Sequence, residues 1–146
     1  MKEIAIINGP NLNRLGRRDP AVYGSCAFEP FLEELRAEFP DIRVSFFQSN
    51  HEGEIIDRIQ RLSDSPDCLG IAINPGAYAH YSYAIADALR DASAVLRIVE
   101  VHISNILTRE EFRRRSVTAE AVNAGVITGC GLDGYRLALL HILNLK

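Results

Sequence analysis

The chain has 146 residues and a formal net charge of −3, which argues against the strongly basic surface of a nucleic-acid-binding protein. Hydrophobic residues make up 47% of the chain, as expected for a single globular domain that spans residues 1–146. No apolar run is long enough to cross a bilayer, and the first residues lack a signal-peptide pattern. Three widely spaced cysteines predict free thiols in a reducing compartment. We therefore expect a cytoplasmic protein without membrane or nucleic-acid partners.

Short runs rich in Ile and Val alternate with stretches of helical periodicity along the chain. Strands are predicted at 3–8, 42–48, 68–74, 95–102 and 125–128. Helices are predicted at 31–38, 52–62, 81–90 and 132–143, with a shorter turn near 109–114. Since this alternation produces right-handed crossovers and a parallel sheet covered on both faces, we expect an α/β, flavodoxin-like three-layer sandwich with a five-stranded parallel sheet.

The loop after the first predicted strand combines Gly, Pro and Asn with Arg17, Arg18 and Tyr23. A guanidinium within a few ångströms favours an ionised phenol, and lowering the pKa of a tyrosine from about 10 to about 7 takes roughly 4 kcal/mol. The loop is therefore suited to hold an anion and to activate Tyr23. An ordinary solvated surface loop is the alternative.

Glycines bracket the loop, so we also expect segment 14–23 to close over a substrate as a lid.

Polar residues follow each of the first four predicted strands. Because open parallel sheets bind ligands outside the carboxyl ends of their strands, these amides, hydroxyls and imidazoles are expected to meet at one edge. Each residue alone has a structural explanation, such as a helix cap for Asn50, a turn for Asn74 or a half-buried position for His102. Together they favour a site. The segments concerned are 8–11, 48–54, 74–80 and 100–105.

Several chemistries lack their usual sequence signals. The chain has no phosphate-binding loop, no dinucleotide-binding glycine motif and no serine-hydrolase elbow. Its histidines lack metal-ligand spacing, and lysine occurs only at Lys2 and Lys146, which leaves no buried amine for a Schiff base. What remains is acid–base chemistry by a tyrosine and a histidine, with arginines and amides to hold an oxyanion or carboxylate.

Four motifs resemble those of the type II 3-dehydroquinate dehydratases, and the resemblance covers nearly the whole chain. They are Ile7 to Leu12 continuing through Tyr23-Gly24, Phe47 to Gly53, Ile73 to Tyr78 with His80, and Glu100 to Asn105. A fifth comprises Gly125-Val126-Ile127, Gly131 and Gly134-Tyr135. The resemblance implies a hydro-lyase that converts 3-dehydroquinate to 3-dehydroshikimate without metal or cofactor, a reaction shared by the shikimate pathway and quinate catabolism.

The resemblance also implies a role for each matching position. Tyr23 would be the base that removes the proton beside the ketone, and Arg18, with Arg17 as a helper, would lower its pKa and stabilise the transition state. Asn11 would hold a water against the enolate oxygen. His102, oriented by Glu100, would protonate the leaving hydroxyl in a trans elimination. The substrate-binding positions are Asn74, His80, Asp87, Ile103, Ser104 and Arg113.

Two of these binding predictions are more specific. The backbone amides of Ile103 and Ser104 are expected to bind the substrate carboxylate. His80 and Asp87 are seven residues apart, which would place them two turns apart on one face of one helix.

The chain also departs from the family pattern. Tyr81 stands where a small polar residue is usual, and segment 116–124 lacks a familiar proline and is one residue longer. We expect this segment to bear on assembly rather than chemistry, because it leads toward a subunit contact; the resemblance implies a homododecamer built from trimers.

Three functions remain as alternatives: an inactive binding or scaffold module, a flavin-binding flavodoxin, and a dehydratase of another cyclic β-hydroxy ketone.

Overall fold

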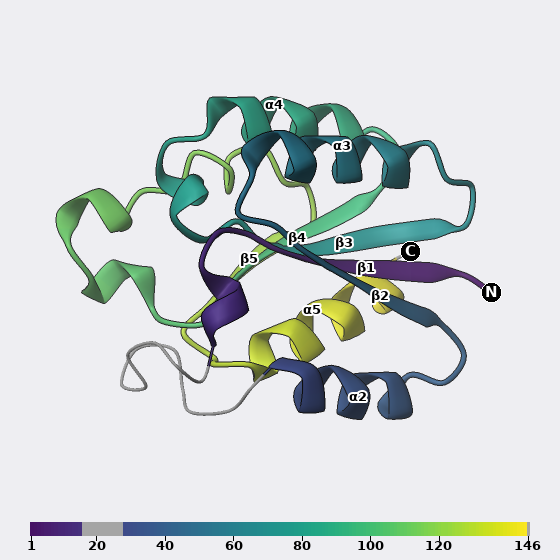
Figure 1. Ribbon diagram of the computed structural model, residues 1–146. Coiled ribbons are helices and arrows are strands. Elements are labelled where there is room, and N and C mark those ends of the chain that lie inside the picture. The colour runs from purple at the N-terminus through teal and green to yellow at the C-terminus, as the bar shows by residue number, and fades with distance from the viewer. Residues whose placement is uncertain (16–27, 146) are drawn as a thin grey trace.

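The computed structural model describes residues 1–15 and 28–145, whose strands form one five-stranded sheet (Figure 1). The sheet is parallel throughout, in the order β2-β1-β3-β4-β5. Its strands are β1 (Glu3–Asn8), β2 (Arg43–Gln48), β3 (Cys68–Asn74), β4 (Arg97–His102) and β5 (Gly125–Thr128). The strand bounds agree closely with those predicted from the sequence. Strand β4 begins two residues later than predicted, because the Val95 and Leu96 amides donate to the Ala92 carbonyl at the end of the preceding helix.

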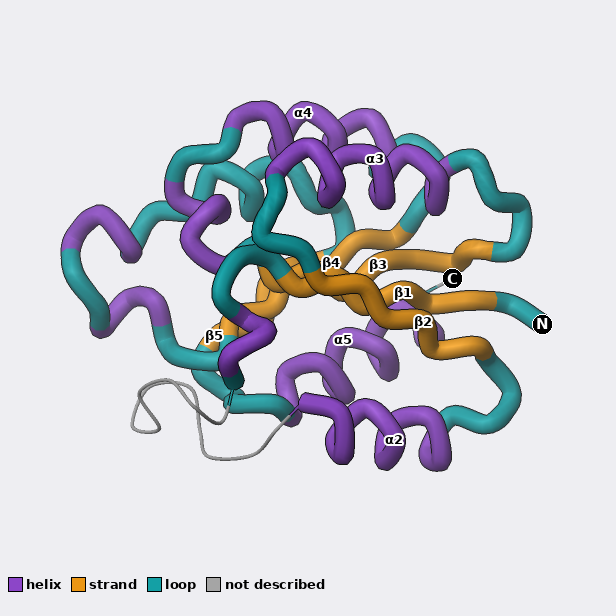
Figure 2. The backbone as a smooth tube through the Cα atoms, in the orientation of Figure 1, coloured by secondary structure: helices purple, strands orange, loops and turns teal. Residues whose placement is uncertain are grey.

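Within residues 1–15 and 28–145, four α-helices cover the two faces of the sheet, which confirms the flavodoxin-like three-layer sandwich. Helices α3 and α4 lie on one face and α2 and α5 on the other (Figures 1 and 2). Their bounds are α2 (Phe28–Glu38), α3 (Glu52–Ser63), α4 (Tyr83–Ala92) and α5 (Asp133–Asn144). The turn predicted near 109–114 is a short 3-10 helix at Glu111–Arg113.

The start of α4 corrects one prediction. Ser82 caps this helix by accepting a hydrogen bond from the Ile85 amide at 3.0 Å, so the helix begins at Tyr83 and not at residue 81. His80 instead ends a separate 3-10 helix at Gly76–His80. The prediction that His80 and Asp87 share a face of one helix is therefore wrong. The reason is the tertiary contact of Ser82, which also donates to the Glu52 carboxylate on α3.

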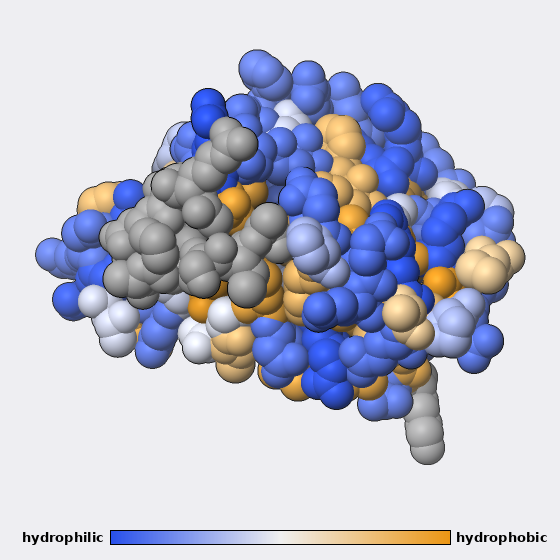
Figure 3. Space-filling view, turned by 60° about the horizontal axis from the view of Figure 1, so that its bottom comes forward, coloured by the Kyte–Doolittle hydropathy of each residue, from blue (hydrophilic) through white to orange (hydrophobic). Residues whose placement is uncertain are grey.

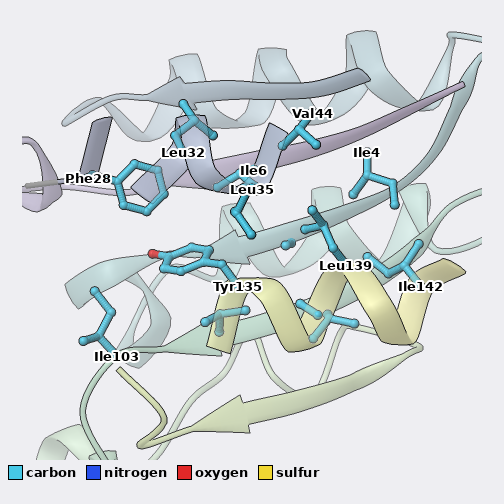
Figure 4. Close-up of a cluster of buried hydrophobic side chains, with 14 of the residues drawn as sticks. Ile4, Ile6, Phe28, Leu32, Leu35, Val44, Ile103, Tyr135, Leu139 and Ile142 are labelled. Atoms are coloured by element: carbon cyan, nitrogen blue, oxygen red, sulfur yellow. The ribbon is translucent and has the colours of Figure 1, made fainter. Parts of the chain in front are cut away.

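The core consists of two apolar layers, one on each side of the sheet. Alternate residues of β1 serve both: Ile4 and Ile6 pack with α2 and α5 (Figure 4), while Ala5 and Ile7 pack with α3 and α4. This burial on both faces explains why the strand sequences are continuously apolar. Figure 3 shows hydrophilic residues over most of the face it presents. In the described part of the chain, no helix is long and apolar enough to span a membrane.

Cys68 and Cys130 are free thiols, as predicted, and Cys26 lies outside the described residues. Burial raises the pKa of the Cys68 thiol to about 11, so this cysteine is a packing residue rather than a nucleophile.

Candidate active site

A cavity of about 110 Å³ opens at the carboxyl ends of β1, β3 and β4, the edge at which the polar strand ends were predicted to meet. Many of its wall residues are predicted site residues, and no carboxylate lies among the described residues that line it. The lining residues are Pro10, Asn11, Leu12, Asn74, Gly76, Ala77, His80, His102, Ile103, Ser104, Ile106, Arg109 and Arg113.

Two predicted residues, Glu100 and Asp87, do not line the cavity, and two others lie outside the described residues. Glu100 lies behind the wall, in contact with His102. Asp87 lies on α4 away from the cavity, with its side chain 81% exposed and paired with Arg90 at 3.3 Å. Tyr23 and Arg18, together with Arg17 and residues 16–23 of the predicted lid, lie outside the described residues.

The loops after β1 and β3 touch at Gly9, and this contact shapes one wall of the cavity. The Gly9 amide donates to the Asn74 carbonyl at 2.7 Å. A Cβ at Gly9 would lie 2.2 Å from the Pro75 carbonyl oxygen, so any other residue would push the loops apart. The contact brings Asn11 and Asn74 to the same cavity.

Asn50 supports this wall rather than capping α3. Its side-chain oxygen accepts from the backbone amide of Asn11 at 2.9 Å, and Asn11 adopts a left-handed conformation with φ 67°. The residue before α3 is His51, which makes no side-chain cap, so the helix-cap interpretation of Asn50 is wrong. The turn predicted at Asn74 is present, because its Oδ1 accepts from the Gly76 amide at 3.1 Å.

His102 and Glu100 form the central contact of the site. The two residues are two apart on β4, and such residues point to the same side of a strand. His102 Nε2 lies 2.7 Å from Glu100 Oε2; Glu100 is fully buried and His102 is 5% exposed, so His102 is more buried than the half-buried position considered from sequence. Since a carboxylate only accepts, Nε2 carries the shared hydrogen, and Nδ1 is the ring nitrogen left for a ligand.

Two hydroxyls complete the surroundings of the Glu100 carboxylate. Ser116 Oγ donates to Oε2 at 2.7 Å, and Thr118 Oγ1 donates to Oε1. Together with His102 they supply the hydrogen bonds that a buried carboxylate needs. Both hydroxyls lie in segment 116–124, which was predicted from the sequence to bear on assembly rather than on chemistry. No pattern in the sequence signals this contact, because it joins β4 to a segment without regular structure.

His80 presents a neutral ring to the cavity. Burial lowers its pKa, and the nearby charges of His102 and Arg113 lower it further, against the raising effect of the hydrogen bond to Arg115. His80 Nδ1 lies 2.7 Å from the Arg115 carbonyl oxygen, which can only accept. Nδ1 therefore carries the hydrogen, and Nε2 is a hydrogen-bond acceptor suited to a hydroxyl of a ligand.

Two arginines of the cluster after β4 line the cavity. Arg113 donates to Glu110 at 2.6 Å, and its guanidinium lies 4.8 Å from the centre of the Phe112 ring. Arg109, which the sequence did not single out, donates to the Ser104 hydroxyl at 3.4 Å. With no carboxylate among the described lining residues, these cations favour an anionic ligand.

The predicted carboxylate-binding pair, Ile103 and Ser104, is held in place by Thr128 at the end of β5 and by Gly131 of the fifth sequence motif. The Ile103 carbonyl accepts from the Gly131 amide at 3.0 Å, and the Ser104 carbonyl accepts from the Thr128 hydroxyl at 3.1 Å. Gly131 has φ 61°, a conformation that favours glycine. The motif thus contributes to the geometry of the cavity wall.

The described residues contain no group of three or more His, Cys, Asp or Glu side chains that could hold a metal ion. The groups at the cavity are suited to proton transfer by an imidazole and to anion binding by guanidinium and amide groups.

Comparison with known proteins shows the family to which the chain is similar. The family model Dehydroquinase class II matches residues 2–143. The 3-dehydroquinate dehydratase of Clostridium botulinum (strain Loch Maree / Type A3) is 50% identical over 146 residues, which cover 99% of this chain and 96% of that one. That of Thermotoga petrophila is 51% identical over 144 residues, which cover 96% and 94%. The crystal structure of type II dehydroquinase from Butyrivibrio crossotus superposes with a TM-score of 0.92 at 46% identity and covers 98% of both chains.

Proposed function

The chain belongs to the class II dehydroquinase family and, like the members of that family, is a hydro-lyase. We propose that it dehydrates 3-dehydroquinate to 3-dehydroshikimate without metal or cofactor. The observation that carries the proposal is the 2.7 Å contact between His102 Nε2 and the buried Glu100 carboxylate, beside a cavity that also holds guanidinium and amide groups. Dehydration of a β-hydroxy ketone needs an acid for the leaving hydroxyl, and His102 is suited to that role.

His102 acts as the acid in this mechanism. Glu100 fixes the ring through Nε2 and balances the positive charge of the imidazolium, so that Nδ1 delivers the proton to the departing hydroxyl. The hydroxyl leaves as water, and the ring becomes neutral. Ser116 and Thr118 keep the carboxylate in position through their hydrogen bonds.

Tyr23 acts as the base, by the family resemblance of its position. It removes the proton from the carbon beside the ketone and produces an enolate, from which the hydroxyl departs in a trans elimination. Arg18 keeps the phenol ionised and stabilises the developing charge, with Arg17 as a helper. Asn11, on the cavity wall beside β1, holds a water against the enolate oxygen.

The remaining lining residues bind the substrate. The backbone amides of Ile103 and Ser104 and the guanidinium of Arg113 receive the carboxylate. His80 accepts from a substrate hydroxyl through its neutral ring, and Asn74 donates to a substrate oxygen. All five line the cavity. Asp87 remains a predicted binding residue whose side chain does not line the cavity of its own chain.

We also propose that the chain assembles as a homododecamer built from trimers. Three exposed aromatic side chains support an assembly: Tyr81, Tyr83 and Phe112 are 60%, 64% and 62% exposed. Tyr81, the departure from the family pattern, packs edge-on against Tyr78 at 5.7 Å. Light scattering of the purified protein measures the mass of the assembly directly.

Proton NMR of 3-dehydroquinate incubated with the purified, chelator-treated protein tests the reaction. The proposal expects the signals of one of the two ring methylenes to give way to the vinyl proton of 3-dehydroshikimate, while the other methylene remains. Turnover of a related cyclic β-hydroxy ketone in place of 3-dehydroquinate would assign the site to another substrate. No turnover of either ketone by the folded protein would support a binding or scaffold module.

A further inference from the structure

Three buried polar side chains connect helix α5 to the ends of β1 and β3. The Tyr135 hydroxyl donates to Asn8 Oδ1 at 2.7 Å and accepts from Asn74 Nδ2 at 3.0 Å. Asn8 and Tyr135 are fully buried, and Asn74 is 4% exposed. Tyr135 belongs to the fifth sequence motif, which has no part in the proposed chemistry. It nevertheless contacts a residue that lines the cavity.

The aromatic cluster of the core fixes the place of this hydroxyl. Tyr135 extends from α5 with its ring near Phe28 (Figure 4), at a centroid distance of 5.1 Å and an edge-to-face angle of 72°. Phe31 lies 6.2 Å from the same ring. A ring held on these sides leaves its hydroxyl little freedom to follow a moving partner.

Among the described residues, the hydrogen bonds of Asn74 leave one of its groups for a ligand. A carboxamide has two N–H donors and one acceptor oxygen. The oxygen of Asn74 accepts from the Gly76 amide at 3.1 Å, and one N–H donates to Tyr135. Asn74 lines the cavity, so the second N–H is the group with which it can meet an oxygen of the substrate.

Stability does not account for this polar cluster. Asn8 Nδ2 is buried without a hydrogen-bond partner among the residues that the structure describes, and a buried polar group without a partner costs free energy. The rest of the strand core, Ile4 to Ile7, is apolar. Apolar groups of similar shape would be as stable or more stable at these positions. A role in the site explains why the polar groups are present.

We propose that Tyr135 is a positioning residue for the dehydration, whose hydroxyl fixes the side-chain amide of Asn74 so that its second N–H meets the substrate. The proposal rests on the proposed function for the identity of the ligand. The order of contacts is Asn8, Tyr135, Asn74 and then substrate, with each group held by the one before it.

The variant Tyr135→Phe tests the proposal, because it removes the hydroxyl and keeps the ring in its packing. The readout is the dissociation constant of 3-dehydroshikimate, measured by calorimetry, which needs no catalysis by the variants. Loss of the fixed amide is expected to weaken binding about fivefold to tenfold, as one neutral hydrogen bond would. Ile142→Val is the matched control: it removes a methylene from the same helix and the same core cluster, and binding should stay at the wild-type value.

A double-mutant cycle separates positioning from a general loosening of the fold. If Tyr135 acts through Asn74, then Tyr135→Phe added to Asn74→Ala should change the dissociation constant by less than about twofold. Wild-type binding by Tyr135→Phe, or a full additional loss in the double variant, would overturn the proposal. Failure of the wild-type protein to turn over 3-dehydroquinate would instead reject the proposed function.

Discussion

The Thr118 hydroxyl donates a hydrogen bond to the Glu100 carboxylate, and both side chains are fully buried. Glu100 belongs to β4, whereas Thr118 lies in the irregular segment before β5. The other carboxylate oxygen contacts Ser116 and His102. The proposed acid is therefore supported by a segment that does not itself line the cavity.

Replacement of Thr118 tests this support. Thr118→Val keeps the shape of the side chain and removes the hydroxyl, which leaves one oxygen of a buried carboxylate without its donor. We expect a loss of stability of about 1–3 kcal/mol and a fall in kcat of about tenfold, because Glu100 can move and carry His102 with it. Thr118→Ser retains the hydroxyl and should recover most of kcat. Steady-state kinetics and urea unfolding measure both effects, and an unchanged kcat in Thr118→Val would contradict this role.

Arg113 is expected to bind the substrate carboxylate, whereas its neighbour Arg114 is not. Arg113 lines the cavity, and Arg114 is exposed and donates to the Arg109 carbonyl. Arg113→Ala should raise KM about tenfold to a hundredfold, as expected for the loss of a charge-assisted hydrogen bond. Arg114→Ala is the matched control and should leave KM within about twofold of wild type. Equal effects of the two substitutions would mean that the cluster acts only through its overall charge.

His80 should make the protein sensitive to mild acid. Its pKa in the folded chain is lowered from the usual 6.5, first by burial and then by His102 and Arg113. The unfolded chain therefore binds more protons than the folded chain just below pH 6.5, so His80 makes stability fall as the pH drops through that range. His80→Asn should reduce the dependence of the melting temperature on pH between about 6.5 and 5. The same dependence in wild type and variant would assign the effect to other groups.

Glu3 should account for part of the unfolding in stronger acid. Burial acts to raise the pKa of Glu3, but hydrogen bonds from Ser45 and Arg43 and the charges of Arg43 and Arg58 outweigh it, so the pKa is lowered from 4.5. The stabilisation is present above pH 4.5 and is lost as the pH falls below that value, where the unfolded chain takes up the proton first.

The variant Glu3→Gln measures this contribution. At pH 7 it should cost about 2 kcal/mol of unfolding free energy, because a buried charged partner is lost. The difference from wild type should shrink as the pH falls below 4.5. Urea denaturation at several pH values gives both quantities, and a difference that stays constant with pH would show that Glu3 does not titrate in this range.

The fold was predictable because its strand signals are local. The bounds of β1, β3 and β5 follow from runs of Ile and Val that end at Asn, Gly or Pro, and a parallel sheet needs such runs. The start of α4 was not predictable, since Ser82 owes its position to a contact with Glu52 on another helix. Local periodicity carries no information on such contacts.

The site was predictable where residues follow a strand directly. The alternation of side chains along β4 puts Glu100 and His102 on one side, and the carboxyl ends of β1 and β3 bring Asn11 and Asn74 to the same cavity. Arg109 and the hydroxyls of segment 116–124 were missed, because loop geometry alone decides which of several charged or polar neighbours points inward. Sequence distance gives no guide to that choice.

We propose Tyr23 and His102 as the base and the acid in the dehydration of 3-dehydroquinate. The most direct test follows the ultraviolet absorbance of the conjugated enone with wild-type protein, Tyr23→Phe and His102→Ala at equal concentrations. We expect the band to grow with wild type and the rate to fall at least about a hundredfold in each variant, since each lacks one proton-transfer group. A flat trace from folded wild-type protein would contradict the proposed reaction, and a wild-type rate in either variant would contradict the role of the replaced residue.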